Sequence, residues 1–421
     1  MLMQYDLNYV KENREALLKS MKKRGIDYPI DEIISAHENV KQLNREIDEL
    51  RHKRNEISKN FKGQSEEDRK LVKKTKEDIE KKEKLTGELA SKANRLFLSM
   101  PNILDESVPI GKDDSENAEI RRWGELRKRP FVVKGHEEIG ISKDIIDMER
   151  AAKITGSRFF YLKGKLVRLQ LALEAYVFDK LIKKGYTPII PPFMMRREGY
   201  EGVTALADFE DVLYKVVGSE DTGESDRYLI ATSEHPMTAM YMNEEIPEEK
   251  LPIKFVARSP CFRREAGAHG KDTKGIFRVH QFEKVEQFAI CKPEDSPKLQ
   301  EELIKNAEEI YQELGLPYHV VNICTGDIGI VATKKYDIEA YMFAQEKYRE
   351  VVSCSNCTDW QSRRLNIKYV DKSGKKDFVH TLNSTAISQR PLVAILEAYQ
   401  NEKGSIKLPE VLAKYAGFDE I

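Results

Sequence analysis

The chain has 421 residues, of which 40% are hydrophobic and 33% are charged. This length favours two domains and allows a sizeable hydrophobic core. Because 70 Lys and Arg residues balance 71 Asp and Glu residues, the net charge of −1 excludes a uniformly basic nucleic-acid-binding protein, and any basic surface must be local.

The cysteines are few and odd in number, which is typical of a reducing compartment and not of a disulfide framework. They are Cys261, Cys291, Cys324, Cys354 and Cys357. The first residues lack the apolar stretch of a signal peptide, and no window approaches the roughly 20 apolar residues of a membrane span. We therefore expect a cytoplasmic protein with no membrane partner.

Residues 33–96 carry a heptad pattern in a highly charged, proline-free segment. The first half of the pattern is Ile33, Ala36, Val40, Leu43, Ile47, Leu50 and Ile57, and the second is Val72, Thr75, Ile79, Lys82, Leu89, Ala93 and Leu96. Gly63 lies between the halves, and Ser65 followed by three acidic residues is typical of a helix start. The sequence predicts an antiparallel coiled-coil hairpin over about 30–98.

Basic residues are frequent on both sides of the predicted turn of this hairpin. They are Arg51, Lys53, Arg54, Lys59, Lys62, Lys70, Lys73, Lys74 and Lys76. A tip of this composition could bind nucleic-acid phosphates. Because acidic residues are interleaved, a solvated arm that only dimerises or acts as a spacer is an equally good interpretation of the pattern.

After Met100 and Pro101 the composition changes, and a linker-like stretch runs to about residue 117. We place the domain boundary between residues 110 and 111. Beyond it, an amphipathic helix should end at Gly185 and another, Leu299–Leu314, at Gly315, with a short proline-flanked edge strand at Thr187. Further strands are expected within 227–232, 253–265, 277–291 and 318–323. This order predicts an α+β fold with an antiparallel sheet flanked by helices.

Two of these strands concentrate arginines, carboxylates and one aromatic ring. If they pair as a hairpin, alternation places Arg263 and Glu265 of one strand near Arg278, Phe282 and Glu286 of the next. Arginines bind phosphate, a phenyl ring stacks on a purine, and carboxylates accept from amines or hydroxyls. An exposed sheet face with cross-strand ion pairs is the simpler alternative. No P-loop motif occurs, so ATP would have to be held by side chains on the sheet.

Several segments, in order along the chain, resemble the seryl branch of the class II aminoacyl-tRNA synthetases. Residues 262–265 with 278–286 look like motif 2, the helix and strand ending at Pro191 like motif 1, and 381–390 like motif 3. Residues 232–234 match the family's TxE signature, 348–355 its ATP and metal segment, and 100–102 with 108–111 its junction after the arm. Between Asn383 and Arg390, motif 3 is one residue shorter than the family pattern.

The resemblance implies an aminoacyl-tRNA ligase that activates L-serine with ATP and Mg²⁺ and transfers it to tRNA(Ser). It implies a tRNA-binding helical domain over 1–110, a class II catalytic domain over 111–421 and a homodimer formed through motif 1. The arm would contact tRNA(Ser), and tRNA(Sec) stays open as a second acceptor.

The same resemblance assigns the site residues. The catalytic residues would be Arg263, Glu350 and Arg390. ATP would contact Arg263, Arg264, Glu265, Arg278, Val279, Phe282, Glu350, Val351, Val352, Ser353 and Arg390, with no separate role for Arg264. Serine would contact Thr232, Ser233, Glu234, Arg263, Glu286 and Thr385, and Mg²⁺ would be held through ATP by Glu350 and Ser353.

Two other functions fit parts of the pattern. A paralogue that loads a carrier protein would share the catalytic half but lack the arm. A degenerate interaction protein would have lost the ATP-binding arginines or the pocket acids, and none is missing here. Cys354 and Cys357 have the spacing of a redox or zinc pair, but no second pair lies nearby, so we interpret them as structural. His269 is expected to be exposed to solvent or to contact the tRNA end.

Overall fold

The computed structural model describes residues 7–59, 65–126, 128–218, 226–265, 272 and 274–421. The chain divides into two compact units, Met1–Ile103 and Leu104–Ile421. Within the described ranges, no helix is both long enough and apolar enough to span a membrane.

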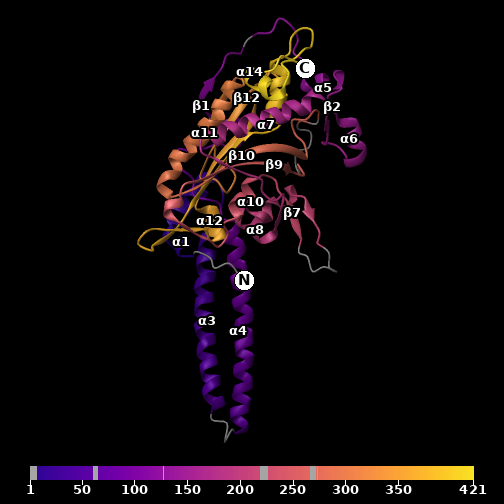
Figure 1. Cartoon of the computed structure of the whole chain (residues 1–421). Coiled ribbons are helices and arrows are strands. Elements are labelled where there is room, and N and C mark those ends of the chain that lie inside the picture. Colours follow the sequence, from indigo (N-terminus) through magenta and orange to yellow (C-terminus); the bar gives the residue numbers. More distant parts are fainter. Residues whose placement is uncertain (1–6, 60–64, 127, 219–225, 266–271, 273) are drawn as a thin grey trace. The chain divides into compact units, whose positions relative to one another are not determined.

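The first unit is entirely helical in its described part. Its helices are α1 (Leu7–Glu12), α2 (Arg14–Arg24), α3 (Ile30–Lys59) and α4 (Glu66–Ser99). The two long helices run side by side as a hairpin (Figure 1). Since each residue adds about 1.5 Å, the 30 residues of α3 extend about 45 Å.

The predicted heptad positions form the seam between α3 and α4. Ile33, Ala36 and Ile47 are buried from α3, and the remaining predicted positions are buried or half-buried. From α4, Lys82 lies in the seam and its Nζ donates to Glu46 Oε2 at 2.5 Å. The coiled-coil prediction is thus confirmed, while the predicted turn with Lys62 and Gly63 lies outside the described residues.

Helix α4 begins with a capping box, as the sequence indicated. The Asp68 backbone N–H donates to Ser65 Oγ at 3.1 Å, and the Ser65 N–H donates to Asp68 Oδ2 at 2.9 Å. Both bonds satisfy backbone donors that the first helical turn leaves without partners.

The second unit is built on an eight-stranded sheet in the order β1-β11-β12-β13-β16-β10-β9-β4. All neighbours pair antiparallel except β4 and β9, which pair parallel. The strands are β1 (Ala118–Trp123), β4 (Thr187–Ile189), β9 (Ile253–Phe262), β10 (Gln281–Cys291), β11 (Tyr318–Asn322), β12 (Lys334–Met342), β13 (Lys347–Thr358) and β16 (His380–Ile387). The predicted α+β class is confirmed, with the proline-flanked strand β4 at the sheet edge.

Alternation along β10 separates the main core from the site. Val285 and Ala289 face one side, where they pack with residues of α7 (Lys165–Lys183), α11 (Ser296–Glu313) and α13 (Arg390–Ala398). Figure 1 shows α7 and α11 lying along the sheet. The even-numbered residues face the other side, where Phe288 joins a second core with α8 (Arg197–Val203), α10 (Glu234–Ala239) and α12 (Trp360–Leu365).

The helix ends predicted from glycine are confirmed. Gly185 follows α7 with φ of +88°, and Gly315 follows α11 with φ of +65°, a conformation that glycine adopts without a Cβ clash. The remaining helices and strands are short. They are β2 (Ile146–Asp147), β3 (Tyr161–Leu162), β5 (Met194–Arg196), β6 (Lys215–Val216), β7 (Arg227–Leu229), β8 (Glu245–Pro247), β14 (Lys368–Val370), β15 (Lys376–Phe378), α5 (His136–Ser142), α6 (Met148–Thr155), α9 (Leu206–Phe209) and α14 (Glu410–Ala416).

Two predicted strands are shorter than the sequence pattern suggested. Strand β9 ends at Phe262 and β10 begins at Gln281, so Arg263, Glu265 and Arg278 lie in the connection and not on the strands. Glu265 has φ of +50°, a left-handed conformation that cannot continue a strand. Strand alternation was therefore the wrong reason to group these three side chains, although the structure does bring them together.

The capping box predicts a local stability effect in α4. Ser65→Ala should cost about 1 kcal/mol in the first turn and speed amide exchange there about fivefold, because a cap acceptor is lost. Hydrogen–deuterium exchange of the intact protein measures this effect at residues 66–70. Ser91→Ala, an exposed change within the same helix, should leave these amides unchanged. Equal exchange in both variants would contradict the predicted role of the cap.

Candidate active site

One pocket lies on the face of the sheet opposite α7 and α11, and it is lined by residues of β10, β13 and β16 and by the connection that follows β9. Thirteen of the residues that the sequence assigned to the site line it: Thr232, Glu234, Arg263, Glu265, Arg278, Val279, Phe282, Glu286, Glu350, Val351, Ser353, Thr385 and Arg390. The sequence analysis did not assign the others, which are Ile276, Phe277, Lys284, Ser355, Asn383, Ser388 and Gln389.

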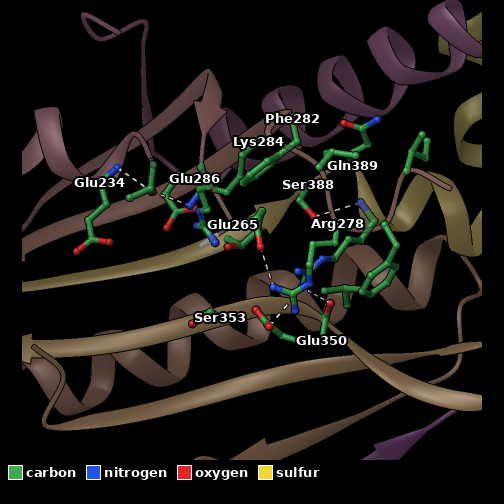
Figure 2. A pocket seen from close by; sticks show the side chains of 18 of the residues that line it. Glu234, Glu265, Arg278, Phe282, Lys284, Glu286, Glu350, Ser353, Ser388 and Gln389 are labelled. Carbon is green, nitrogen blue, oxygen red and sulfur yellow. Dashed lines mark hydrogen bonds and ion pairs between the residues drawn. The ribbon is translucent and has the colours of Figure 1, made fainter. Parts of the chain in front are cut away.

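One part of the pocket, which we call the acidic end, consists of Thr232, Glu234, Lys284 and Glu286. Lys284 Nζ lies 2.7 Å from Glu286 Oε2 and donates to Thr232 Oγ1 at 2.6 Å. Glu234, the first residue of α10, accepts from Gln361 Nε2 at 2.8 Å. Figure 2 shows Lys284 and the two glutamates together, away from Glu350.

Burial has different consequences for the two glutamates of the acidic end. Burial and the nearby charge of Glu286 raise the pKa of Glu234 to about 7. Burial also raises the pKa of Glu286, but the adjacent Lys284 ammonium opposes that shift. Because Lys284 contacts Glu286 directly, Glu286 is the carboxylate with a permanent counter-charge, and Glu234 is the one able to receive a cation from outside.

The middle of the pocket contains an aromatic ring and an arginine. The Arg263 guanidinium carbon lies 5.2 Å from the centre of the Phe282 ring, and Arg263 Nε donates to the Ala231 carbonyl at 3.4 Å. The Arg263 backbone N–H donates to the His280 carbonyl at 2.9 Å, which continues the β9–β10 pairing one residue beyond the strand. This bond fixes the backbone from which the guanidinium enters the pocket.

The other part, which we call the arginine end, consists of Glu265, Arg278, Glu350 and Arg390. Arg278 Nη1 donates to Glu265 Oε2 at 2.8 Å, and Arg390 Nη1 donates to the Glu350 carbonyl at 2.7 Å. Burial alone would raise the pKa of Glu350, but Arg390, Lys335 and Arg263 together lower it below its ordinary value. Glu350 is therefore an anion among cations.

The Phe277 ring packs against two arginines at the arginine end. The guanidinium carbons of Arg349 and Arg390 lie 4.2 Å and 4.7 Å from its centre, and Arg349 Nη2 donates to Asp272 Oδ2 at 2.6 Å. Cation–π contact and ion pairing thus hold two arginines in fixed orientations. Arg390 lines the pocket even though motif 3 is short before it.

Three assigned residues do not line this pocket. Arg264 is exposed and its backbone N–H donates to the Val212 carbonyl. Ser233 and Val352 are fully buried behind the surface. His269 lies outside the described residues, while Cys354 and Cys357 are buried and form no disulfide, which is consistent with a structural role.

The missed residues left a signal that alternation could have revealed. Lys284 has the same parity as Phe282 and Glu286 on β10, and Asn383 has the same parity as Thr385 on β16. A buried lysine between two predicted site residues is unusual unless it is paired. Ser388 and Gln389 lie between the end of β16 and Arg390, where strand alternation gives no prediction.

The pocket can therefore bind an ammonium group at its acidic end and a polyanion with a flat ring in its middle and arginine end. Among the described residues there is no group of three or more His, Cys, Asp or Glu residues that could hold a metal ion by themselves. A cation at Glu350 would need oxygen ligands from a bound substrate, as Mg²⁺ with a nucleotide has.

Comparison with known proteins agrees with this chemistry. Residues 4–104 match the seryl-tRNA synthetase N-terminal domain, and residues 214–399 match the tRNA synthetase class II core domain (G, H, P, S and T). The serine–tRNA ligase of Methanocella arvoryzae is 48% identical over 427 residues, covering 97% of this chain and 98% of that protein. The serine–tRNA ligase of Thermococcus onnurineus is 50% identical over 448 residues, covering 99% and 96%.

A solved structure is similar over the same extent. The crystal structure of seryl-tRNA synthetase from Pyrococcus horikoshii complexed with ATP has a TM-score of 0.88 and 45% identity, and the match covers 99% of each chain. The chain belongs to the seryl-tRNA synthetase family, the class II aminoacyl-tRNA ligases that join serine to tRNA.

Proposed function

We propose that the pocket binds L-serine at its acidic end and ATP in its middle and arginine end, and joins them as seryl-adenylate. The observation that carries this proposal is the separation of two buried carboxylates from a cluster of arginines within one pocket. The ATP complex of the Pyrococcus horikoshii relative supports the same use of the pocket here. Serine-dependent ATP–pyrophosphate exchange tests it, and no exchange would refute it.

The serine ammonium would pair with Glu234, and its hydroxyl would donate to Glu286. Thr385 lies opposite Glu286 in the β10–β16 pairing. Thr232 accepts a hydrogen bond from Lys284, which also contacts Glu286. Both threonine hydroxyls would therefore line the space for the serine side chain beside Glu286. Alanine could not make the hydrogen bond that the serine hydroxyl would donate to Glu286, and that loss disfavours alanine. The Lys284 ammonium opposes the upward pKa shift that burial imposes on Glu286, and the carboxylate is placed to accept from the serine hydroxyl.

In the ATP half, the adenine would stack on Phe282, and its amine would donate to Glu265. Arg278, which pairs with Glu265, would bind the terminal phosphates. Arg263 would hold the α-phosphate while the serine carboxylate attacks it in line. The bond between the α-phosphorus and the bridging oxygen to the β-phosphate then breaks, and pyrophosphate leaves. Positioning and charge stabilisation would supply the catalysis, and no covalent enzyme intermediate is needed.

The oxygen ligands at the arginine end fit Mg²⁺. Glu350 stays ionised at neutral pH and Ser353 offers a hydroxyl, so the two supply hard oxygen ligands and leave the rest to the nucleotide phosphates. The ion would neutralise phosphate charge when bound.

Three further proposals concern partners and location. The α3–α4 arm would bind tRNA(Ser) through the basic residues on either side of its turn, of which Lys62 lies outside the residues that the structure describes. A homodimer would form through α7 and β4, where Val167, Leu171 and Ile182 of α7 and Ile190, directly after β4, expose apolar surface. None of the five cysteines, all within the described residues, forms a disulfide, which fits a cytoplasmic enzyme.

Replacing Arg263 should abolish activation. Arg263→Ala should lower kcat/KM for pyrophosphate exchange by about 10³-fold, because phosphate charge is no longer stabilised in the transition state. Steady-state exchange kinetics measure this change. Arg122→Ala removes an exposed arginine on β1 that pairs with Glu119, and it should leave exchange unchanged. Near-normal exchange in Arg263→Ala would remove this residue from the mechanism.

Serine binding should strengthen as pH rises. With a pKa of about 7, Glu234 is mostly protonated at pH 6 and mostly ionised at pH 8, and only the ionised form attracts an ammonium group. The KM for serine should therefore fall about tenfold across this range, while the KM for ATP does not follow it. Glu234→Gln should bind serine weakly at both values. A serine KM that is equal at pH 6 and pH 8 would contradict the assignment.

Shortening the arm should separate the two steps of the reaction. Deleting residues 40–90 and joining the ends with a short flexible linker should leave pyrophosphate exchange within about twofold of the intact chain, because no residue of the pocket is removed. Charging of a tRNA(Ser) transcript should be lost, since the basic residues beside the turn are gone. Charging at the intact rate would show that tRNA is held elsewhere.

A further inference from the structure

His136 lies outside the pocket, yet it contacts a backbone segment that lines the pocket. It is the first residue of α5, and its side chain is only 7% exposed. Its Nδ1 lies 3.2 Å from Glu397 Oε1, and the backbone N–H of Ile276 donates to its Nε2 at 3.0 Å. Three segments that are distant in the sequence therefore meet at one imidazole ring.

These partners fix the tautomer of His136. Because Nε2 accepts a hydrogen bond from a backbone amide, it carries no proton, and Nδ1 must carry the proton that it donates to Glu397. Glu397 is itself held, because its second oxygen accepts from the Ala344 backbone N–H at 3.0 Å. The carboxylate is 1% exposed, so the bond is shielded from water. The ring has one orientation that satisfies all these groups.

The close approach of the chain at Gly275 is a second, independent observation. Gly275 has φ of +70°, and a Cβ built at this position would lie 2.0 Å from His136 Nε2. Only glycine lets the backbone come near enough to the ring for the next amide to donate. The hydrogen bond between the Ile276 amide and His136 therefore depends on glycine at position 275.

The segment held in this way carries part of the ATP half of the pocket. Ile276, Phe277, Arg278 and Val279 all line the pocket in sequence. Phe277 supports Arg390, which begins the same helix, α13, that carries Glu397. Hydrogen bonds of His136 and Glu397 thus connect helix α13, which begins with Arg390, to the backbone segment that carries Arg278.

We propose that His136, oriented by Glu397, is a positioning residue that holds residues 276–279 in the conformation that binds ATP. It touches neither substrate and acts through the Ile276 amide. Serine contacts come from other segments, at Thr232, Glu234, Glu286 and Thr385, so they should not depend on this bond. The inference rests on the proposed function, because it assigns ATP to the arginine end.

The experiment compares substrate constants in His136 variants. His136→Ala should raise the KM for ATP in pyrophosphate exchange about tenfold and leave the KM for serine within about twofold, because a buried backbone donor loses its acceptor. A merely structural role would lower the active fraction or both affinities together. His319→Ala is the matched control. It removes a histidine that lies between the carboxylates of Glu119 and Glu339, and it should change neither constant.

Two amide variants decide whether the acceptor atom is responsible. A glutamine oxygen reaches the position of Nε2, whereas an asparagine oxygen reaches only that of Nδ1. His136→Gln should therefore recover most of the ATP affinity and His136→Asn should not. Equal ATP constants for the two amides, or an unchanged ATP constant in His136→Ala, would overturn the proposal.

A direct binding measurement separates this inference from the proposed function. Calorimetric titration of the intact protein with ATP, without serine, should show the same order: wild type, then His136→Gln, then His136→Asn and His136→Ala. If the four proteins bind ATP with affinities in this order but the wild type shows no serine-dependent exchange, the proposed function fails and the positioning role stands. If all variants bind ATP equally, the positioning role fails.

Discussion

The antiparallel pairing of β9 with β10 is the constraint on which both the core and the site depend. Residue 285 of β10 faces α7 and α11, and residues 284 and 286 face the pocket, so a shift of one residue in register would exchange them. Such a shift would bury Lys284 and Glu286 among leucines and expose Val285. Burying these two charged side chains among leucines, away from the Thr232 hydroxyl that Lys284 also contacts, is costly, and this cost disfavours the shifted register. The site is thus held in place by the same alternation that builds the core.

Charge inside the pocket is the second consequence of this arrangement. Burying carboxylates is unfavourable unless cations or hydrogen-bond donors compensate them. Lys284 compensates Glu286, Arg278 compensates Glu265, and Arg390 compensates Glu350. Glu234 has only the neutral amide of Gln361 as its hydrogen-bond donor among the described residues, and its pKa rises as a result. The least compensated carboxylate is also the one that we assign to a cationic substrate group.

The sequence predicted much of this because its strongest patterns are local. Heptad spacing located the seam residues Ile47 and Ile79, and glycine located the ends of α7 and α11. Parity placed Phe282 and Glu286 on one face. Periodicity failed where the backbone leaves the strand, since the positive φ of Glu265 depends on tertiary context. The contact of His136 with Glu397, 261 residues apart, has no local signal at all.

The resemblance to a family supplied the roles that periodicity could not, and the geometry adds what a motif omits. Glu234 and Glu350 are the same residue type, yet the pKa of the first is raised and that of the second is lowered. The difference lies in their neighbours, since Arg390, Lys335 and Arg263 act on Glu350 and Glu286 acts on Glu234. A pocket built in this way is polarised before any ligand arrives. In the function that we propose, serine and ATP would be distinguished by charge before shape is tested, because an ammonium group would lower the energy of the acidic end and a triphosphate that of the arginine end.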